Sequence, residues 1–244
     1  MSHEEPRQQY PRVSICWLAQ MTLTVANVAS KNGGVSVKGT SAYAGDDAVP
    51  ALVRDAVAAA EKMGFEESCL PPHGRLLALL AAGLGPGVIG ETGTGCGVGL
   101  AWLAGAAHPA ARLVSIDRDE ARVATVRELF AKRETGPPVE VRHGDWSELV
   151  TDGPFDLLVL DGGGHGKTGG VVDVDEWLRP RGVVVIDDFT PFDTWPPRHG
   201  SDLDHARLHW LRHPRLLASE IQLTSTVSVV VARYLGPNTS RDDG

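Results

Sequence analysis

The sequence predicts an α/β fold built on a doubly wound, mostly parallel sheet, with one antiparallel strand near the C-terminus. Short apolar runs alternate with helical patterns, which is typical of a parallel sheet with helices on both faces. The runs are residues 87–91, 113–117, 139–143, 157–161 and 183–187, and the helical patterns are residues 97–107, 119–133 and 168–178. Two further runs, at residues 216–223 and 226–234, are separated by two residues, which permits an antiparallel hairpin but no crossover helix.

Two helices are expected before the first strand. Val53, Val57 and Ala60 fall on one helical face. Pro50 suits the first turn of this helix, and Gly64 suits its C-terminal cap. A second helix is expected at residues 74–82, which contain four leucines.

The length of 244 residues suffices for one large domain with a full core. We expect this domain at residues 49–236, after an N-terminal extension at residues 1–48 in which partial disorder is left open, and before a tail at residues 237–244. The apolar stretch at residues 13–28 is interrupted by polar residues, so it matches neither a signal peptide nor a membrane span. Met21 is an alternative start that the sequence leaves open.

Charge and cysteine content favour a cytoplasmic protein that does not bind nucleic acid. The formal net charge is −8, whereas proteins that bind nucleic acid concentrate Lys and Arg against the phosphates. Cys16, Cys69 and Cys96 are odd in number and lack a Cys-x-x-Cys spacing, so neither a disulfide framework nor a zinc knuckle is indicated. A reducing cytoplasm fits best. We expect no nucleic acid and no membrane as partner, and we leave a homodimer open.

The most informative motif is Glu-Thr-Gly-Thr-Gly-Cys-Gly at residues 91–97, between the first run and the next helix. Glycine lets the backbone turn sharply and lets a ligand approach it closely, and a helix start offers N–H groups to an anionic ligand end. A dinucleotide fingerprint needs Gly-x-Gly-x-x-Gly/Ala. Counted from Gly93 or Gly95, its sixth position is Val98 or Leu100, so that pattern fails. A tight turn without a ligand is the alternative.

Acids follow the next two runs as well. Asp117 ends the second run, where a carboxylate can accept bonds from both hydroxyls of a ribose. Asp145 and Trp146 follow the third run. A helix cap at Asp117 and a core position for Trp146 are the simpler alternatives. Because the carboxyl ends of parallel strands share one edge of the sheet, three acids there favour one ligand site.

These motifs resemble those of the class I S-adenosylmethionine-dependent methyltransferases. Acid-x-Gly-x-Gly-x-Gly is similar to their first motif, whose acid faces the methionine end of the cofactor, and Gly144-Asp145-Trp146 is similar to their adenine-binding motif. The resemblance implies a Rossmann-like sheet of seven strands, with Asp145 on the adenine amine and Trp146 or Arg118 beside the ring. The implied cofactor-binding residues are Glu91, Gly93, Gly95, Gly97, Asp117, Arg118, Asp145, Trp146 and Asp161.

Over residues 68–234 the resemblance extends to the metal-dependent O-methyltransferases typified by the catechol and caffeoyl-CoA enzymes. Residues 72–77 match the helix before their first motif, and residues 155–161 and 183–188 are similar to the strands with their metal-binding acids. The resemblance implies that Asp161, Asp187 and Asp188 bind Mg²⁺ or Ca²⁺ and that the substrate is a small hydroxylated metabolite. Such a cation would lower the pKa of the hydroxyl and fix its direction. Capping of the following segment is the alternative for Asp187 and Asp188.

Two positions depart from this branch. Asp188 stands where the family has Asn, and Gly164 stands where it has its catalytic lysine. His165, whose ordinary pKa suits neutral pH, and Lys167 are the candidate catalytic bases. A mobile glycine-rich loop in which neither is catalytic is the alternative.

Residues 189–214 are rich in aromatic residues and proline, and we expect them to form a substrate wall and lid. Three histidines recur there every fourth residue, which gives either a zinc site or, more simply, a polar helix face. Four arginines either recognise an anionic substrate or are solvated. These residues are His205, His209, His213, Arg198, Arg207, Arg212 and Arg215.

The main hypothesis is therefore a metal-assisted O-methyltransferase. A metal-independent methyltransferase for another nucleophile is the first alternative. A catalytically silent cofactor-binding protein is the second, and the displaced lysine favours it. An aminopropyltransferase has a related fold and cofactor, but no feature of the sequence demands it. Likeness of fold alone does not choose among these functions.

Overall fold

The computed structural model describes residues 38–46, 48–161 and 172–237. Its strands are β1 (Val88–Thr92), β2 (Arg112–Asp117), β3 (Val139–His143), β4 (Phe155–Leu160), β5 (Leu178–Phe189), β6 (Arg198–His199), β7 (Asp202–Leu203), β8 (Leu216–Gln222) and β9 (Ser228–Tyr234). Its helices are η1 (Thr40–Tyr43), α1 (Ala51–Met63), α2 (Pro71–Ala82), α3 (Val98–Ala106), α4 (Glu120–Ala131), η2 (Trp146–Asp152), α5 (Val174–Trp177) and α6 (His205–Leu211), of which η1 and η2 are 3-10 helices.

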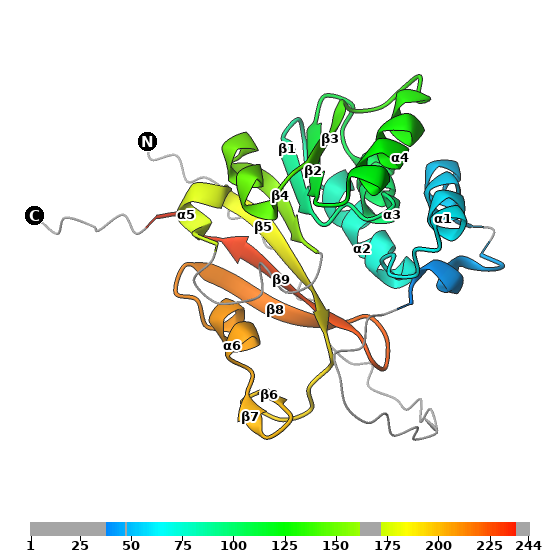
Figure 1. Ribbon diagram of the computed structural model, residues 1–244. Helices are drawn as coiled ribbons and strands as arrows, with labels where there is room; N and C mark the ends of the chain where they lie inside the picture. The colour runs from blue at the N-terminus through cyan, green and yellow to red at the C-terminus, as the bar shows by residue number, and fades with distance from the viewer. Residues whose placement is uncertain (1–37, 47, 162–171, 238–244) are drawn as a thin grey trace, which may run out of the picture. The chain divides into compact units, whose positions relative to one another are not determined.

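The described strands form a seven-stranded sheet in the order β3-β2-β1-β4-β5-β9-β8 and a separate pair, β6 and β7 (Figure 1). Neighbours from β3 to β5 are parallel, whereas β9 is antiparallel to both β5 and β8. The predicted fold class and its single antiparallel strand are confirmed. The predicted two-residue hairpin is wrong, because five residues, 223–227, connect β8 to β9. The N–H groups of Leu223 and Thr224 both donate to Val227 O, at 2.9 and 3.1 Å, and close this turn.

Both faces of the sheet are apolar and covered by helices, as a doubly wound sheet requires. Alternate residues of one strand, such as Leu157 and Leu158 of β4, enter two different cores because side chains alternate between the faces of a strand. Helices α1 to α4 pack on one face, and η2, α5 and α6 pack on the other (Figure 1). No helix of the described residues is long and apolar enough to cross a membrane.

Most predicted helix boundaries agree with the structure. Helix α1 ends at Gly64, which has the predicted left-handed conformation with φ of 66°. Helix α2 begins at Pro71 and not at residue 74, because proline is tolerated in the first turn, where its missing N–H is not needed. The helix expected at residues 168–178 lies partly outside the described residues, and its described part is α5.

The strand order reverses between β1 and β4. From β1 the chain proceeds outward to β2 and β3, and then returns to place β4 on the other side of β1. The following connections therefore diverge at the carboxyl ends of β1 and β4. In open α/β sheets, ligands bind at this switch point.

Candidate active site

A cavity of about 320 Å³ lies at this switch point, a volume at the lower end of the range for small-molecule sites. Its walls include the glycine loop, the carboxyl ends of the five parallel strands, and residues between 65 and 73 at the approach to α2. Most of the residues that the sequence indicated are in this lining. They are Glu91, Gly93, Gly95, Asp117, Arg118, Trp146, Asp161, Asp187 and Asp188, whereas Gly97 and Asp145 lie outside it.

The glycine loop has the backbone conformation that its sequence predicts. Gly93, Gly95 and Gly97 have φ values of 76°, 52° and 83°, a region that other residues rarely adopt. The N–H groups of Gly93 and Thr94 donate to Ile116 O of β2, at 2.9 and 3.3 Å. The loop is thus fixed against the neighbouring strand, with its backbone exposed to the cavity.

Glu91 ends β1 as a buried acid and is only 2% exposed. Ser115 Oγ donates to its Oε2 at 2.6 Å, and Ser115 in turn shares a hydroxyl bond with Thr94. A Cβ at Gly99 would lie 2.6 Å from Glu91 Oε1, so only glycine lets α3 approach this carboxyl. Burial raises the pKa of Glu91 to about 8, against the bond from Ser115, which lowers it. The carboxylate form therefore favours a cationic ligand group beside it.

Asp117 braces the loop from β2. Gly95 N donates to its Oδ2 at 2.8 Å, and Asp119 N donates to its Oδ1 at 2.9 Å. The N-cap of α4 is Asp119, whose Oδ1 accepts from Arg122 N at 3.0 Å. The capping alternative for Asp117 is therefore wrong, and this carboxylate faces the cavity with room to accept further bonds.

Asp145 has a structural role beside the cavity. Its carboxylate accepts from Ser147 N and Oγ, at 3.0 and 2.7 Å, and pairs with Arg118. Glu148 accepts from Asp145 N at 3.1 Å, which completes a capping box at the start of η2. The bonds from Ser147, and then the contact with Arg118, lower the pKa of Asp145 to about 2. The predicted adenine contact of Asp145 stays a prediction, while Trp146 and Arg118 do line the cavity.

Three further acids line the cavity, at the ends of β4 and β5. Asp161 follows β4, and Thr92 Oγ1 donates to its backbone oxygen at 2.9 Å. Asp187 is 5% exposed, while Asp188 is exposed and has φ of 55°. Within residues 38–46, 48–161 and 172–237, no three His, Cys, Asp or Glu side chains are grouped so that they could hold a metal ion. Among the described side chains, the acids thus share a cavity but do not form a coordination set, and the predicted metal site stays a prediction.

The two candidate bases, His165 and Lys167, lie outside the described residues. The same holds for Gly164, where the resembling family has its lysine. The catalytic assignment of this loop therefore stays a prediction.

None of residues 189–214, the expected substrate wall, lines this cavity, and the lid stays a prediction. The guanidinium of Arg207 makes cation–π contacts with two aromatic rings of this segment. It lies 4.9 Å from the ring centroid of Phe189 and 5.2 Å from that of Phe192. Arg207 is 2% exposed and bonds to Asp204, Glu220 and Thr190 O. Both alternatives for it, anion recognition and solvation, are therefore wrong.

The other cationic residues of this segment also contact protein groups. Arg198 donates to Ser201 O, Arg212 lies over Trp195, and Arg215 pairs with Asp175. The ring centroids of His209 and His213 lie 5.5 Å apart in a T-shaped contact, and these two do not form a metal group with His205 or any other described side chain. Helix α6 ends at Leu211, so only His205 and His209 lie on it, and the predicted polar face with all three histidines is wrong.

The cavity wall at residues 65–70 was not predicted from the sequence. Phe65, Glu67, Ser68, Cys69 and Leu70 all line the cavity, and His73 continues the wall into α2. The match over residues 72–77 indicated the helix but not the connection before it. The doubled proline at residues 71 and 72 was the available signal, because it ends any regular structure before α2 and fixes this connection as a loop.

Comparison with known proteins agrees with this geometry. Residues 91–189 match the model of a methyltransferase domain family. A Mycobacterium avium protein named as an O-methyltransferase is 29% identical over 168 residues, which cover 61% of this chain and 76% of that protein. A Mycobacterium tuberculosis protein similarly named is 31% identical over 120 residues, 48% of this chain and 54% of its own length.

Two solved structures share the fold. The O-methyltransferase TomG of Streptomyces achromogenes, in complex with S-adenosylmethionine, superposes with a TM-score of 0.62 at 21% identity and covers 77% of this chain and 91% of its own. An O-methyltransferase of Bacillus cereus, in complex with S-adenosylhomocysteine, gives a TM-score of 0.63 at 19% identity, with 79% and 95% covered. Fold, matched domain and named relatives therefore agree: residues 91–189 carry a methyltransferase domain, and the chain is similar to proteins named as O-methyltransferases.

Proposed function

We propose that this protein transfers the methyl group of S-adenosylmethionine to a hydroxyl of a small metabolite bound in the cavity at the carboxyl edge of the sheet. The observation that carries the proposal is the arrangement of this cavity. A glycine loop with three left-handed glycines is flanked by Glu91 and Asp117 at adjacent strand ends, and three further acids lie at the ends of β4 and β5.

The lining residues support one orientation of the cofactor in this cavity. The ammonium of its methionine end would meet the Glu91 carboxylate, a buried acid at the end of β1. Its ribose hydroxyls would donate to Asp117, which holds the loop through Gly95 N at 2.8 Å. The adenine would lie near Trp146 and Arg118, which line the same cavity. This orientation directs the sulfonium methyl toward the ends of β4 and β5.

Methyl transfer requires an acceptor oxygen in line with the bond between methyl and sulfur. The oxygen attacks the methyl carbon, the carbon–sulfur bond breaks, and S-adenosylhomocysteine leaves while the hydroxyl proton passes to a base. The chain contributes positioning, which can lower such a barrier by several kcal/mol. We propose His165 or Lys167 as the base, since both follow β4 within a few residues of Asp161.

Metal assistance is a separate part of the proposal. Asp161, Asp187 and Asp188 supply the carboxylate oxygens that Mg²⁺ or Ca²⁺ prefers, and all three line one cavity. A bound cation would lower the pKa of the acceptor hydroxyl. Because the described side chains do not form a coordination set, transfer without a metal is the second candidate.

A turnover assay separates these candidates. Purified protein is stripped with excess chelator and supplied with S-adenosylmethionine and a panel of catechols, with and without Mg²⁺. We expect turnover to fall at least tenfold in chelator and to return with Mg²⁺, and Asp187→Ala to lower it similarly. Asp202→Ala is the control, because Asp202 is exposed and lies outside the cavity lining. Full turnover in chelator would establish the metal-independent candidate. Binding of S-adenosylhomocysteine with no turnover on any acceptor would refute the proposed transfer.

We also propose that the chain acts in the cytoplasm, while a homodimer, which the sequence leaves open, stays a prediction. The acidic charge balance and the absence of a disulfide pattern support the compartment. Light scattering on the purified full chain measures the assembly, and a monomer at micromolar concentration would contradict it.

A further inference from the structure

The cavity wall at residues 65–70, hereafter the strap, is held in place by an upstream segment, residues 39–43, hereafter the clasp. Thr40 Oγ1 donates to Phe65 O at 2.8 Å and shares a hydroxyl bond with Ser68 Oγ at 2.8 Å. Thr40 N donates to Glu66 O at 3.2 Å. A Cβ at Gly39 would lie 1.8 Å from Ser68 O, so this close approach requires glycine.

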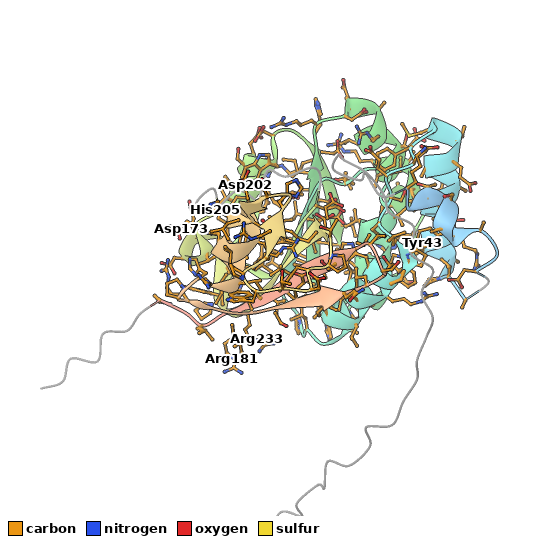
Figure 2. The ribbon with its side chains drawn as sticks, turned by 90° about the horizontal axis from the view of Figure 1, so that it is seen from below. Tyr43, Asp173, Arg181, Asp202, His205 and Arg233 are labelled. Carbon is orange, nitrogen blue, oxygen red and sulfur yellow. The ribbon has the colours of Figure 1, made fainter. Side chains whose placement is uncertain are left out.

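Tyr43 links the strap to α3, the helix that follows the glycine loop. Its hydroxyl donates to Cys69 O at 2.9 Å and accepts from Trp102 Nε1 at 3.0 Å. Trp102 lies on α3, the helix that begins at the glycine loop, and both aromatic side chains are buried. A Cβ at Gly74 would lie 2.1 Å from Trp102 Nε1, so glycine in α2 makes room for this contact. Figure 2 shows Tyr43 among the blue and cyan helices, far from Asp202 and His205.

The strap residues that the clasp holds are lining residues of the cavity. Phe65, Ser68 and Cys69 receive the bonds from Thr40 and Tyr43, and all three face the cavity. The ring of Phe65 packs against the glycine loop: a Cβ added at Gly95 would lie 3.0 Å from this ring. The guanidinium of Arg122 lies 5.0 Å from the same ring. The strap thus closes over the loop residue whose N–H is bonded to Asp117.

We propose that Thr40 and Tyr43 are positioning residues for S-adenosylmethionine: the clasp keeps the strap closed over the bound cofactor and slows its release. This inference rests on the proposed function. Neither side chain lines the cavity, so both act through the strap. Removal of one clasp hydroxyl leaves buried polar partners without their bond, which favours local opening of the strap. A bound cofactor then dissociates through the opened wall.

The main test is Tyr43→Phe, with Tyr234→Phe as its matched control. Both tyrosines are buried and use their hydroxyls in hydrogen bonds across the fold. Tyr43 bonds to Cys69 O and Trp102 Nε1, whereas Tyr234 bonds to Asp175 of α5, outside the cavity lining. Both variants should lower the melting temperature. Only Tyr43→Phe should raise the Kd for S-adenosylhomocysteine, by roughly tenfold, and mostly through a faster dissociation rate. Calorimetric titration and stopped-flow displacement on the full chain measure these two quantities.

A second pair separates positioning from general loss of structure. Thr40→Val removes the hydroxyl at nearly constant volume and should weaken binding severalfold, while Thr40→Ser keeps the hydroxyl and should restore wild-type affinity. Amide hydrogen exchange at residues 65–70 should accelerate in Tyr43→Phe and Thr40→Val but not in Tyr234→Phe. An unchanged Kd in Tyr43→Phe, or an equal increase in Tyr234→Phe, would overturn the clasp while leaving the cofactor site intact. Failure of the wild-type chain to bind S-adenosylhomocysteine would instead refute the proposed function, and the clasp with it.

Discussion

The two ends of the sheet's carboxyl edge differ in how they use charge. At the cofactor end, Glu91 and Asp117 are held by short contacts with nearby hydroxyl and N–H groups and face the cavity. Beyond β5, Arg207 is buried by the protein itself, between Asp204, Glu220 and two phenylalanine rings. The first arrangement leaves carboxylates available to a ligand. In the second arrangement the charges are paired with one another inside the protein, so they stabilise the segment beyond β5 and leave no charged group for a ligand.

This difference explains which interpretations of the sequence succeeded. A ligand-binding acid at a strand end is visible because the strand, the acid and the glycines after it are adjacent in the chain. The contacts of Arg207 span 17 residues to Thr190 and 13 residues to Glu220. Nothing in the local sequence indicates that those partners meet, so a charged segment there is easily mistaken for a binding surface.

The largest effect is expected from Arg207→Met, which tests whether the segment beyond β5 is only structural. The variant leaves Asp204 and Glu220 buried without their cation, a loss of about 3–5 kcal/mol in the free energy of unfolding. For a domain of this size that corresponds to a fall of roughly 10 °C in melting temperature. Scanning calorimetry and urea unfolding measure both.

The control for that experiment is Arg198→Met in the same segment. Arg198 is exposed and donates to Ser201 O, so its loss should change the free energy of unfolding by no more than about 0.5 kcal/mol. Affinity for S-adenosylhomocysteine should stay within about twofold of wild type in both variants. A marked loss of affinity in Arg207→Met would show that the two ends of the edge are coupled, and the contrast between them would fail.

Asp117→Ala sharpens the same contrast from the cofactor end. Two ribose bonds to a charged acceptor contribute at least about 3 kcal/mol together, so the Kd for S-adenosylhomocysteine should rise roughly 100-fold or more. Asp119→Ala is the matched control two residues away, because it removes the N-cap of α4, which costs about 1 kcal/mol of stability. Titration calorimetry on both variants decides the ribose assignment, which unchanged affinity in Asp117→Ala would refute.

Most of the fold was predictable because each strand and helix has its own local signal. Apolar runs, the cap at Gly64 and the glycine loop all depend on neighbours in the chain. The failures have a different physical origin. Strand β5 begins at Leu178, before the predicted apolar run at residues 183–187, because pairing of Leu178 with Phe155 of β4 extends it through a polar stretch. Local periodicity does not predict pairing between residues that are distant in the chain.

The site follows the same division. Glu91, Asp117 and the glycines were predictable, since backbone conformation and acid placement are encoded within residues 91–117. The strap was not predictable, because its position depends on contacts with distant residues. Thr40 lies 25 and 28 residues before its two partners in the strap, and Tyr43 lies 26 residues before Cys69. The position of Asp145 after β3 was predicted, but its structural role was not. Its capping bonds with Ser147 are seen only in the structure.

The smallest effect is expected from Glu91→Gln. This variant tests whether the Glu91 carboxyl serves the ligand and not the stability of the empty protein. Burial raises the pKa of Glu91 to about 8 from its ordinary value of 4.5. Between these pH values the folded chain holds a proton that the unfolded chain has released, so this carboxyl makes the fold less stable as pH rises across that window. Below pH 4.5 both states are protonated, and its contribution is fully retained.

Glu91→Gln removes this dependence, since the amide does not titrate. In the ligand-free chain, the stability of the variant relative to wild type should therefore grow as pH rises from 5 to 8, measured by urea unfolding at three pH values. Glu128→Gln, at an exposed position of α4, should run parallel to wild type. Affinity for S-adenosylhomocysteine should change in the opposite direction, falling roughly tenfold in Glu91→Gln because the proposed ammonium loses its charged acceptor. A residue whose replacement stabilises the empty protein and weakens ligand binding is one kept for function. Parallel pH profiles for Glu91→Gln and wild type would contradict this account, since the carboxyl would then be ionised in the empty cavity.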